Sequence, residues 1–172
     1  MLAGIVTVIT MAALPQPAQD TAARRDTALS APTPTIEQIR YLKGLKMATR
    51  GVAQIRDGLN RVARTQQADS LTRRRAVRRL GGLCGTARSF IVTGRPKMQP
   101  TAYADSMRAL AKTLTMRLDS LTTALTSCEK TAGRDPTTVT TTLTSKLKNY
   151  DDALLAFRTA LKPDTTKAIS QQ

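Results

Sequence analysis

The chain has 172 residues, enough for one domain with extensions and for a sizeable buried core. It contains no Trp, two Phe and three Tyr, so the core must be built from aliphatic side chains, which favours helices over a sheet. It also lacks His, which removes the usual general base at neutral pH, the commonest metal ligand and an axial ligand for haem. We therefore expect an all-α protein.

The formal charge of +15 is concentrated in one part of the chain. Residues 40–97 hold 15 Lys and Arg against 2 Asp, which gives +13; residues 1–39 hold 2 basic against 3 acidic residues, and residues 98–172 hold 10 against 7. A field of one sign attracts anionic partners, and added salt weakens the attraction. Nucleic acid, anionic lipid and an acidic protein surface all fit this property.

An apolar, uncharged stretch occupies residues 2–14. As a helix it would be about 20 Å long, short of the roughly 30 Å bilayer core. We expect residues 1–18 to be a secretory signal, or else a retained segment that contacts a membrane or a partner. The Pro, Ala and Thr mixture of residues 19–34 predicts a linker. The expected location is periplasmic or otherwise extracytoplasmic, with the protein membrane-associated as an extrinsic protein.

Three heptads, each beginning with a glycine, stand at the centre of the first predicted helix, residues 35–66. The glycines are Gly44, Gly51 and Gly58, and they run beside a stripe of apolar residues at a and d positions. Because glycine costs a helix about 1 kcal/mol relative to alanine, this spacing indicates a face where another backbone comes close.

Helical periodicity continues to the end of the predicted bundle. It predicts helices at about 70–94, 101–132 and 136–162, followed by a tail at 163–172. Four long helices with short connections favour an up-down-up-down four-helix bundle with an extended N-terminal leader. In such a bundle we expect Gly51 to lie near the level of Gly82 and Gly85.

The densest run of charge lies at the start of the second predicted helix. Arginine favours bidentate contact with carboxylate or phosphate, and almost no acidic residue lies nearby. We therefore predict a partner-binding site here, the alternative being a solvated face. Nucleic acid is a weaker candidate, because stacking aromatics and a helix-turn-helix pattern are missing. The predicted binding residues are Arg61, Arg64, Arg73, Arg74, Arg75, Arg78 and Arg79.

Cys84 and Cys128 are the two cysteines, and cysteines of an exported chain usually pair. If the second and third helices meet at one level, however, the two lie about 25 Å apart along the bundle, beyond the reach of a disulfide. Either the thiols stay free, or the second helix breaks at residues 81–85 and folds back. We favour the disulfide.

No catalytic set emerges from the residue patterns. A Glu-x-x-His pair, a nucleophile elbow, a phosphate-binding loop and a haem attachment motif are all missing. We therefore expect a protein that is not an enzyme, with no cofactor, no metal and no small-molecule substrate.

In outline the pattern resembles periplasmic four-helix bundles such as the cytochromes c′ and the Spy-like chaperones, without the haem motif of the first or the LTxxQ repeats of the second. The leader at residues 1–34, the basic region 40–97 and the missing cofactor ligands resemble the membrane-extrinsic, pigment-free structural subunits of bacterial photosynthetic reaction-centre and antenna complexes. This resemblance implies a structural subunit that docks a basic helical hairpin on an anionic membrane surface or an acidic membrane-protein complex. The alternative is a periplasmic bundle that binds a ligand or client, as a chaperone or sensor does.

Overall fold

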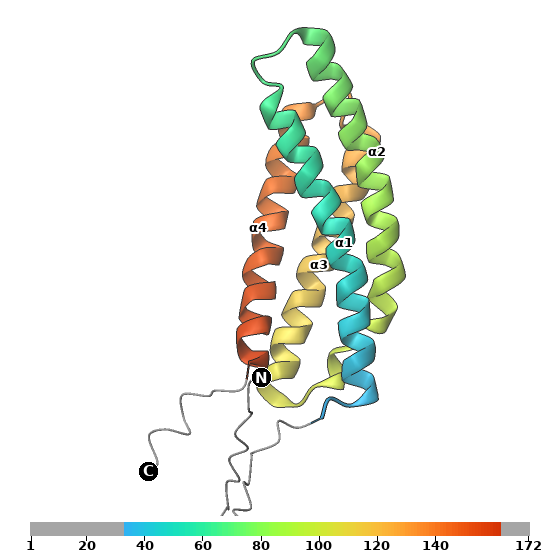
Figure 1. Ribbon diagram of the computed structural model, residues 1–172, viewed down its shortest axis with the longest axis vertical. Helices are drawn as coiled ribbons and strands as arrows, with labels where there is room; N and C mark the ends of the chain where they lie inside the picture. The colour runs from blue at the N-terminus through green and yellow to red at the C-terminus, as the bar shows by residue number, and fades with distance from the viewer. Residues whose placement is uncertain (1–32, 163–172) are drawn as a thin grey trace, which may run out of the picture. The chain divides into compact units, whose positions relative to one another are not determined.

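The computed structural model describes residues 33–162, which form four α-helices that pack against one another (Figure 1). No strand occurs in this range, which confirms the all-α class, and none of its helices carries an apolar stretch long enough to traverse a bilayer. The predicted export segment 1–18, the linker up to residue 32 and the tail 163–172 lie outside the described residues. The elements are α1 (Ile36–Arg64), α2 (Ser70–Gly94), η1 (Arg95–Lys97), η2 (Pro100–Ala102), α3 (Asp105–Thr131) and α4 (Pro136–Leu161).

Side-chain caps fix the beginnings of three helices. Thr35 and Gln38 form a capping box at α1, with each side chain hydrogen-bonded to the other's backbone N–H. The Asp69 carboxylate accepts from two backbone N–H groups at the start of α2. Asp135 caps α4, where Pro136 occupies the first helical position and needs no hydrogen-bond partner for a backbone N–H. These caps explain why the predicted helix starts agree with the structure to within one residue here.

The predicted start of the third helix at residue 101 is wrong. Pro100 begins a short 3-10 turn, and Tyr103 then adopts an extended backbone before α3 starts at Asp105. This extended residue turns its ring into the end of the bundle, where it lies edge-on to Tyr41 and Phe157 at centroid distances of 5.2 and 5.4 Å. Burial of the three rings therefore outweighs the helical periodicity of this stretch.

α1 and α2 approach most closely at the heptad glycines, which are buried. A methyl group on Gly44 would lie 2.6 Å from the carbonyl oxygen of Gly94, and one on Gly51 would lie 2.6 Å from that of Ala87. At Gly58 the nearest atoms are instead the side-chain ends of two leucines of α2, 2.9 and 3.0 Å away. The two helices are thus in backbone contact at Gly44 and Gly51 and are separated by side chains at Gly58, near the turn that joins them.

The predicted level of Gly51 is also wrong, by about one helical turn. Gly51 lies against Ala87 and Phe90, whereas a methyl group on Gly82 would meet no other element within 4 Å and Gly85 lies against Glu129 of α3. The facing pairs Gly44 with Gly94 and Gly51 with Ala87 are both symmetric about residue 69 in the sequence. The prediction had placed this midpoint earlier in the chain, so α2 is shifted relative to α1. The glycine of α2 that meets α1 is Gly94.

A disulfide joins Cys84 of α2 to Cys128 of α3, with their Cα atoms 6.1 Å apart. α2 is continuous through residues 81–85, so the break that we considered does not occur. The assumption that fails is the common level of the helix ends: Arg95, at the end of α2, pairs with Asp119, 14 residues into α3. α3 therefore extends about 21 Å beyond α2, and this offset brings the two cysteines to the same level.

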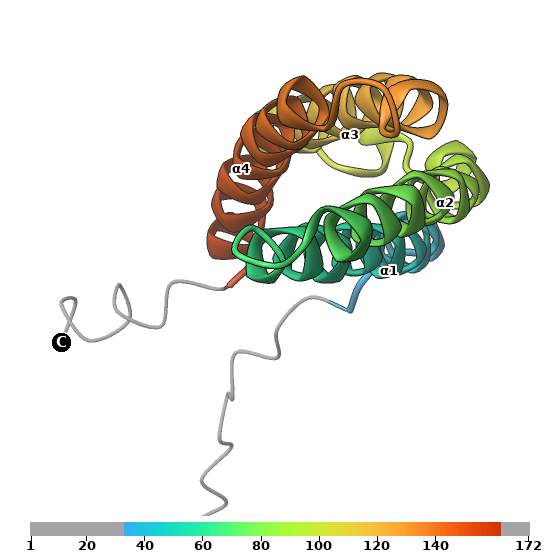
Figure 2. The same cartoon turned by 90° about the horizontal axis from the view of Figure 1, so that it is seen from above.

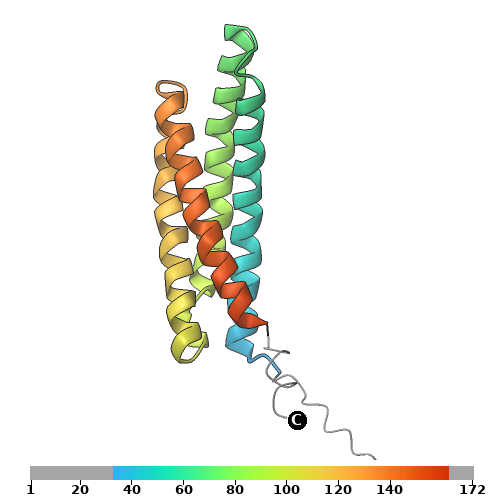
Figure 3. The same ribbon diagram turned by 90° about the vertical axis from the view of Figure 1, so that its left-hand side faces the viewer.

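The pair α1 and α2 lies beside the pair α3 and α4, as seen along the bundle in Figure 2 and from the side in Figure 3. The Tyr41 hydroxyl donates to the Ala111 carbonyl across the core, and Thr49 and Tyr150 share a hydrogen bond between α1 and α4. Burial raises the pKa of Tyr150, so this hydroxyl stays protonated as a donor at neutral pH. The two hairpins thus share one core.

We predict that Gly51→Ala destabilises the protein by about 1–3 kcal/mol, because the added methyl group meets a backbone carbonyl and forces the helices apart. Gly82→Ala is the matched control: this glycine is exposed on the same helical hairpin, and the change should stabilise by up to about 1 kcal/mol. Urea denaturation measures both. A Gly51→Ala variant as stable as Gly82→Ala contradicts the close packing.

We also predict that Cys84→Ala/Cys128→Ala lowers the free energy of unfolding by about 4 kcal/mol, because the disulfide closes a long loop in the unfolded chain. The sequence separation of the two cysteines is 44 residues. Urea denaturation of the variant and of the oxidised parent gives the difference. A parent that unfolds identically with and without reductant would contradict this contribution.

Candidate functional site

Seven arginines gather where α1 ends and α2 begins, at the end of the α1–α2 hairpin (Figure 1). We call this set the basic end, and it contains every residue of the predicted binding site. All seven are exposed. Two come from the last turns of α1 and five from the first turns of α2: Arg61, Arg64, Arg73, Arg74, Arg75, Arg78 and Arg79.

Within residues 33–162, no arginine of the basic end belongs to an ion pair. Asp57 and Asp69 each lie four residues from the nearest of these arginines, and Asp69 is used as the cap of α2. A hydrogen bond from the Thr72 hydroxyl is the main cause that lowers the pKa of Asp69, so the cap is ionised at neutral pH. The ion pairs of the described residues are Arg56–Asp151, Arg88–Glu129, Arg95–Asp119 and Lys148–Asp152.

The structure divides the arginines of α2 between two sides of the helix. Residues four apart lie on the same side of a helix, so Arg74 and Arg78 form one pair while Arg75 and Arg79 form another about 100° away. Each pair contributes to the lining of a different hollow. The sequence prediction treated the arginines as one surface, and this is the main difference that the structure adds.

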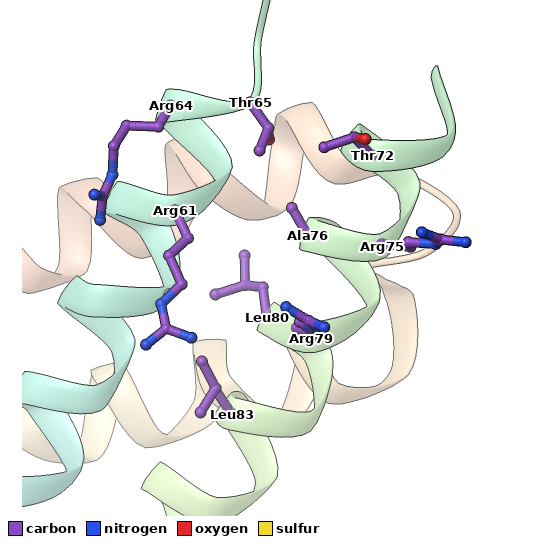
Figure 4. Close-up of a pocket in the computed structure, with 10 residues that line it drawn as sticks. Arg61, Arg64, Thr65, Thr72, Arg75, Ala76, Arg79, Leu80 and Leu83 are labelled. Atoms are coloured by element: carbon purple, nitrogen blue, oxygen red, sulfur yellow. The ribbon is translucent and has the colours of Figure 1, made fainter. Parts of the chain in front are cut away.

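The first hollow, which we call the α1–α2 pocket, is an opening of about 440 Å³ between the two helices (Figure 4). Four arginines line it, two from each helix, together with the hydroxyl side chains of Thr65 and Thr72. Small and apolar residues form the rest of the lining. The complete lining is Gly58, Arg61, Arg64, Thr65, Thr72, Arg75, Ala76, Arg79, Leu80 and Leu83.

The arginines of the α1–α2 pocket do not all point the same way. In Figure 4 the guanidinium groups of Arg61 and Arg79 lie on opposite sides of the gap between the helices, near Leu80 and Leu83. Arg64 and Arg75 point away from the gap, on its two sides. The opening exists because the leucine side chains at Gly58 hold the helices apart here, whereas the backbones touch farther along α1.

The second hollow, which we call the outer groove, lies between α2 and the turn that joins α3 to α4. Its volume is about 560 Å³. Three arginines line it, and its lining contains no acidic residue. The residues are Ser70, Arg73, Arg74, Val77, Arg78, Gly133 and Pro136.

The remaining predicted site residues have structural places. Gly44, Gly51 and Gly58 lie in the α1–α2 interface, and Cys84 and Cys128 form the disulfide. Sequence reasoning did not find the α1–α2 pocket. A helical projection of α2 would have placed Ala76 and Leu83 on the side of Arg75 and Arg79, but the width of the gap depends on contacts with α1.

Comparison of the chain with protein-family models, with characterised proteins and with solved structures gave no match, so the function is argued from the chemistry of the basic end.

Proposed function

We propose that the protein is a non-enzymatic structural or accessory subunit that docks its basic α1–α2 hairpin on an anionic partner. One observation carries the proposal: the basic end brings together seven exposed arginines, and none of them belongs to an ion pair among the described residues. Their fields add instead of cancelling, which attracts a negatively charged surface and speeds association with it.

The proposed partner is an anionic membrane surface or an acidic membrane-protein complex. Arginines on two sides of α2 suit an extended anionic surface better than a single small anion, because one small anion reaches only one of the two pairs. The guanidinium group binds carboxylate and phosphate through paired hydrogen bonds, so both kinds of surface offer suitable groups. By the resemblance noted in the sequence, a bacterial reaction-centre or antenna assembly is one such complex.

We propose an extracytoplasmic location and an up-down-up-down order of the helices. The disulfide supports the location, because such bonds persist mainly in oxidising compartments. The order is supported by contacts between neighbouring helices. Gly44 lies against Gly94 in the first hairpin, and Arg95 pairs with Asp119 between the second and third helices.

We predict that Arg73→Glu/Arg74→Glu/Arg78→Glu abolishes recovery of the partner from solubilised membranes, because the change reverses three charges in the outer groove. Far-UV circular dichroism should show an unchanged helix content, since exposed charges contribute little to folding. The matched control is Lys43→Glu/Lys112→Glu/Arg117→Glu, which makes the same change in net charge at three exposed positions outside the basic end. Partner recovery that falls equally in both variants contradicts a docking site at the basic end.

Co-purification of the native protein at low and at high salt tests the role itself. We expect association with membranes at low salt and release at high salt, because the attraction is electrostatic. Recovery only as a free monomer at low salt contradicts docking and favours the alternative of a periplasmic bundle that binds a ligand or client.

A further inference from the structure

The α1–α2 pocket combines two properties that a docking surface does not need. Positive charge surrounds its mouth, and an apolar floor lies directly beneath that charge. Leu80 is buried beneath the lining, and Leu83 and Ala76 are half-buried in it. A recess of this composition is suited to a molecule with one charged and one apolar part.

The charged part of the ligand must be an anion. Arg61 and Arg79 lie on opposite sides of the gap, and no acidic residue lines the pocket to separate their like charges (Figure 4). The two hydroxyl groups at the mouth do not supply donors, because Thr65 already donates to the Val62 carbonyl and Thr72 to the Asp69 carboxylate. The guanidinium groups are therefore the donors that the pocket offers.

The geometry favours phosphate over carboxylate as the anionic group. A carboxylate has two oxygens in one plane and matches a single guanidinium group. A phosphate monoester presents three unesterified oxygens in a tetrahedral arrangement, so it can accept from Arg61 on one helix and Arg79 on the other at the same time. This bridging contact would also relieve the repulsion between the two arginines.

The floor calls for an apolar chain on that phosphate. Inorganic phosphate would leave the half-buried Leu83 in contact with water, and an uncharged apolar molecule would leave the guanidinium groups without an anion. An alkyl chain attached to the phosphate covers Leu83 while the phosphate contacts the arginines, so both parts of the lining are used.

We propose that the α1–α2 pocket binds an alkyl phosphate, with the phosphate bridging Arg61 and Arg79 and the chain lying on Leu83. Such a group occurs in a bilayer lipid, phosphatidic acid, and in a free amphiphile. The inference goes beyond the proposed function, because the pocket binds a free amphiphile whether or not the basic end docks on a partner.

The first test titrates the full chain with octyl phosphate below its critical micelle concentration, by isothermal calorimetry. Inorganic phosphate and octyl glucoside are the comparison ligands. Inorganic phosphate has the anionic group without the alkyl chain, and octyl glucoside has the alkyl chain without the anionic group. We expect octyl phosphate to bind at least tenfold more tightly than either. Equal binding of inorganic phosphate, or equal binding of octyl glucoside, overturns the proposal.

The second test uses variants with matched charge. Arg61→Gln/Arg79→Gln should weaken octyl phosphate binding at least tenfold, whereas Arg74→Gln/Arg78→Gln makes the same charge change in the outer groove and should leave binding within twofold. All four positions are exposed, so thermal melts should show both variants folded. Equal weakening by the two variants shows a general attraction to the basic end and overturns the pocket.

Leu83→Asn tests the apolar floor separately. It should remove most of the preference for octyl phosphate over inorganic phosphate, and an unchanged preference overturns the placement of the chain. Flotation with vesicles that contain phosphatidic acid, a phosphate monoester, or phosphatidylcholine alone then identifies the source of the ligand. If Arg61→Gln/Arg79→Gln loses binding to the anionic vesicles, the pocket takes a bilayer lipid; if it loses only octyl phosphate, the pocket takes a free amphiphile.

Discussion

Backbone contact between α1 and α2 is the constraint on which the rest of the structure depends. Gly44 and Gly51 bring the helices so close that a methyl group at either position would meet a carbonyl oxygen. Contact of this kind allows no adjustment by side-chain rotation, so it fixes the register of the hairpin and the level of its turn. It also decides where the hairpin opens: beyond Gly51 the leucines of α2 replace the backbone as neighbours of α1, and the space between the helices becomes the α1–α2 pocket.

Capping residues and helical periodicity predicted where most helices lie in the sequence. They did not predict how far one helix is shifted along its neighbour. The caps at Thr35, Asp69 and Asp135 act within four residues, so the sequence alone reveals them. The start of α3 depends on Tyr103 packing against rings from distant parts of the chain, which no local period contains. The distance expected between the cysteines was wrong for the same reason. It assumed that α2 and α3 end at one level, whereas the pairing of Arg95 with Asp119 sets a long offset.

The positive charge of the candidate site could be predicted from the sequence. The division of its arginines between the α1–α2 pocket and the outer groove could not. Seven arginines with two nearby aspartates already indicated an anionic partner, because counting charges requires no structure. The four-residue spacings of Arg74 with Arg78 and of Arg75 with Arg79 already place these arginines on two sides of α2. Only the structure shows that α1 lies next to one side and the α3–α4 turn next to the other. Arg61 lies across the gap from Arg79 because the hairpin register places them so, and that register depends on the buried glycines.

The described chain begins and ends at the end of the bundle opposite the arginines (Figure 1). α1 alone runs for 29 residues between these two ends, about 43 Å at the rise of an α-helix. The disulfide and the glycine contact oppose sliding of the helices along this axis, so the length is fixed. The described bundle is therefore a rigid spacer, and a partner bound as proposed at the arginines would lie about 43 Å from the end of the bundle that holds residues 33 and 162.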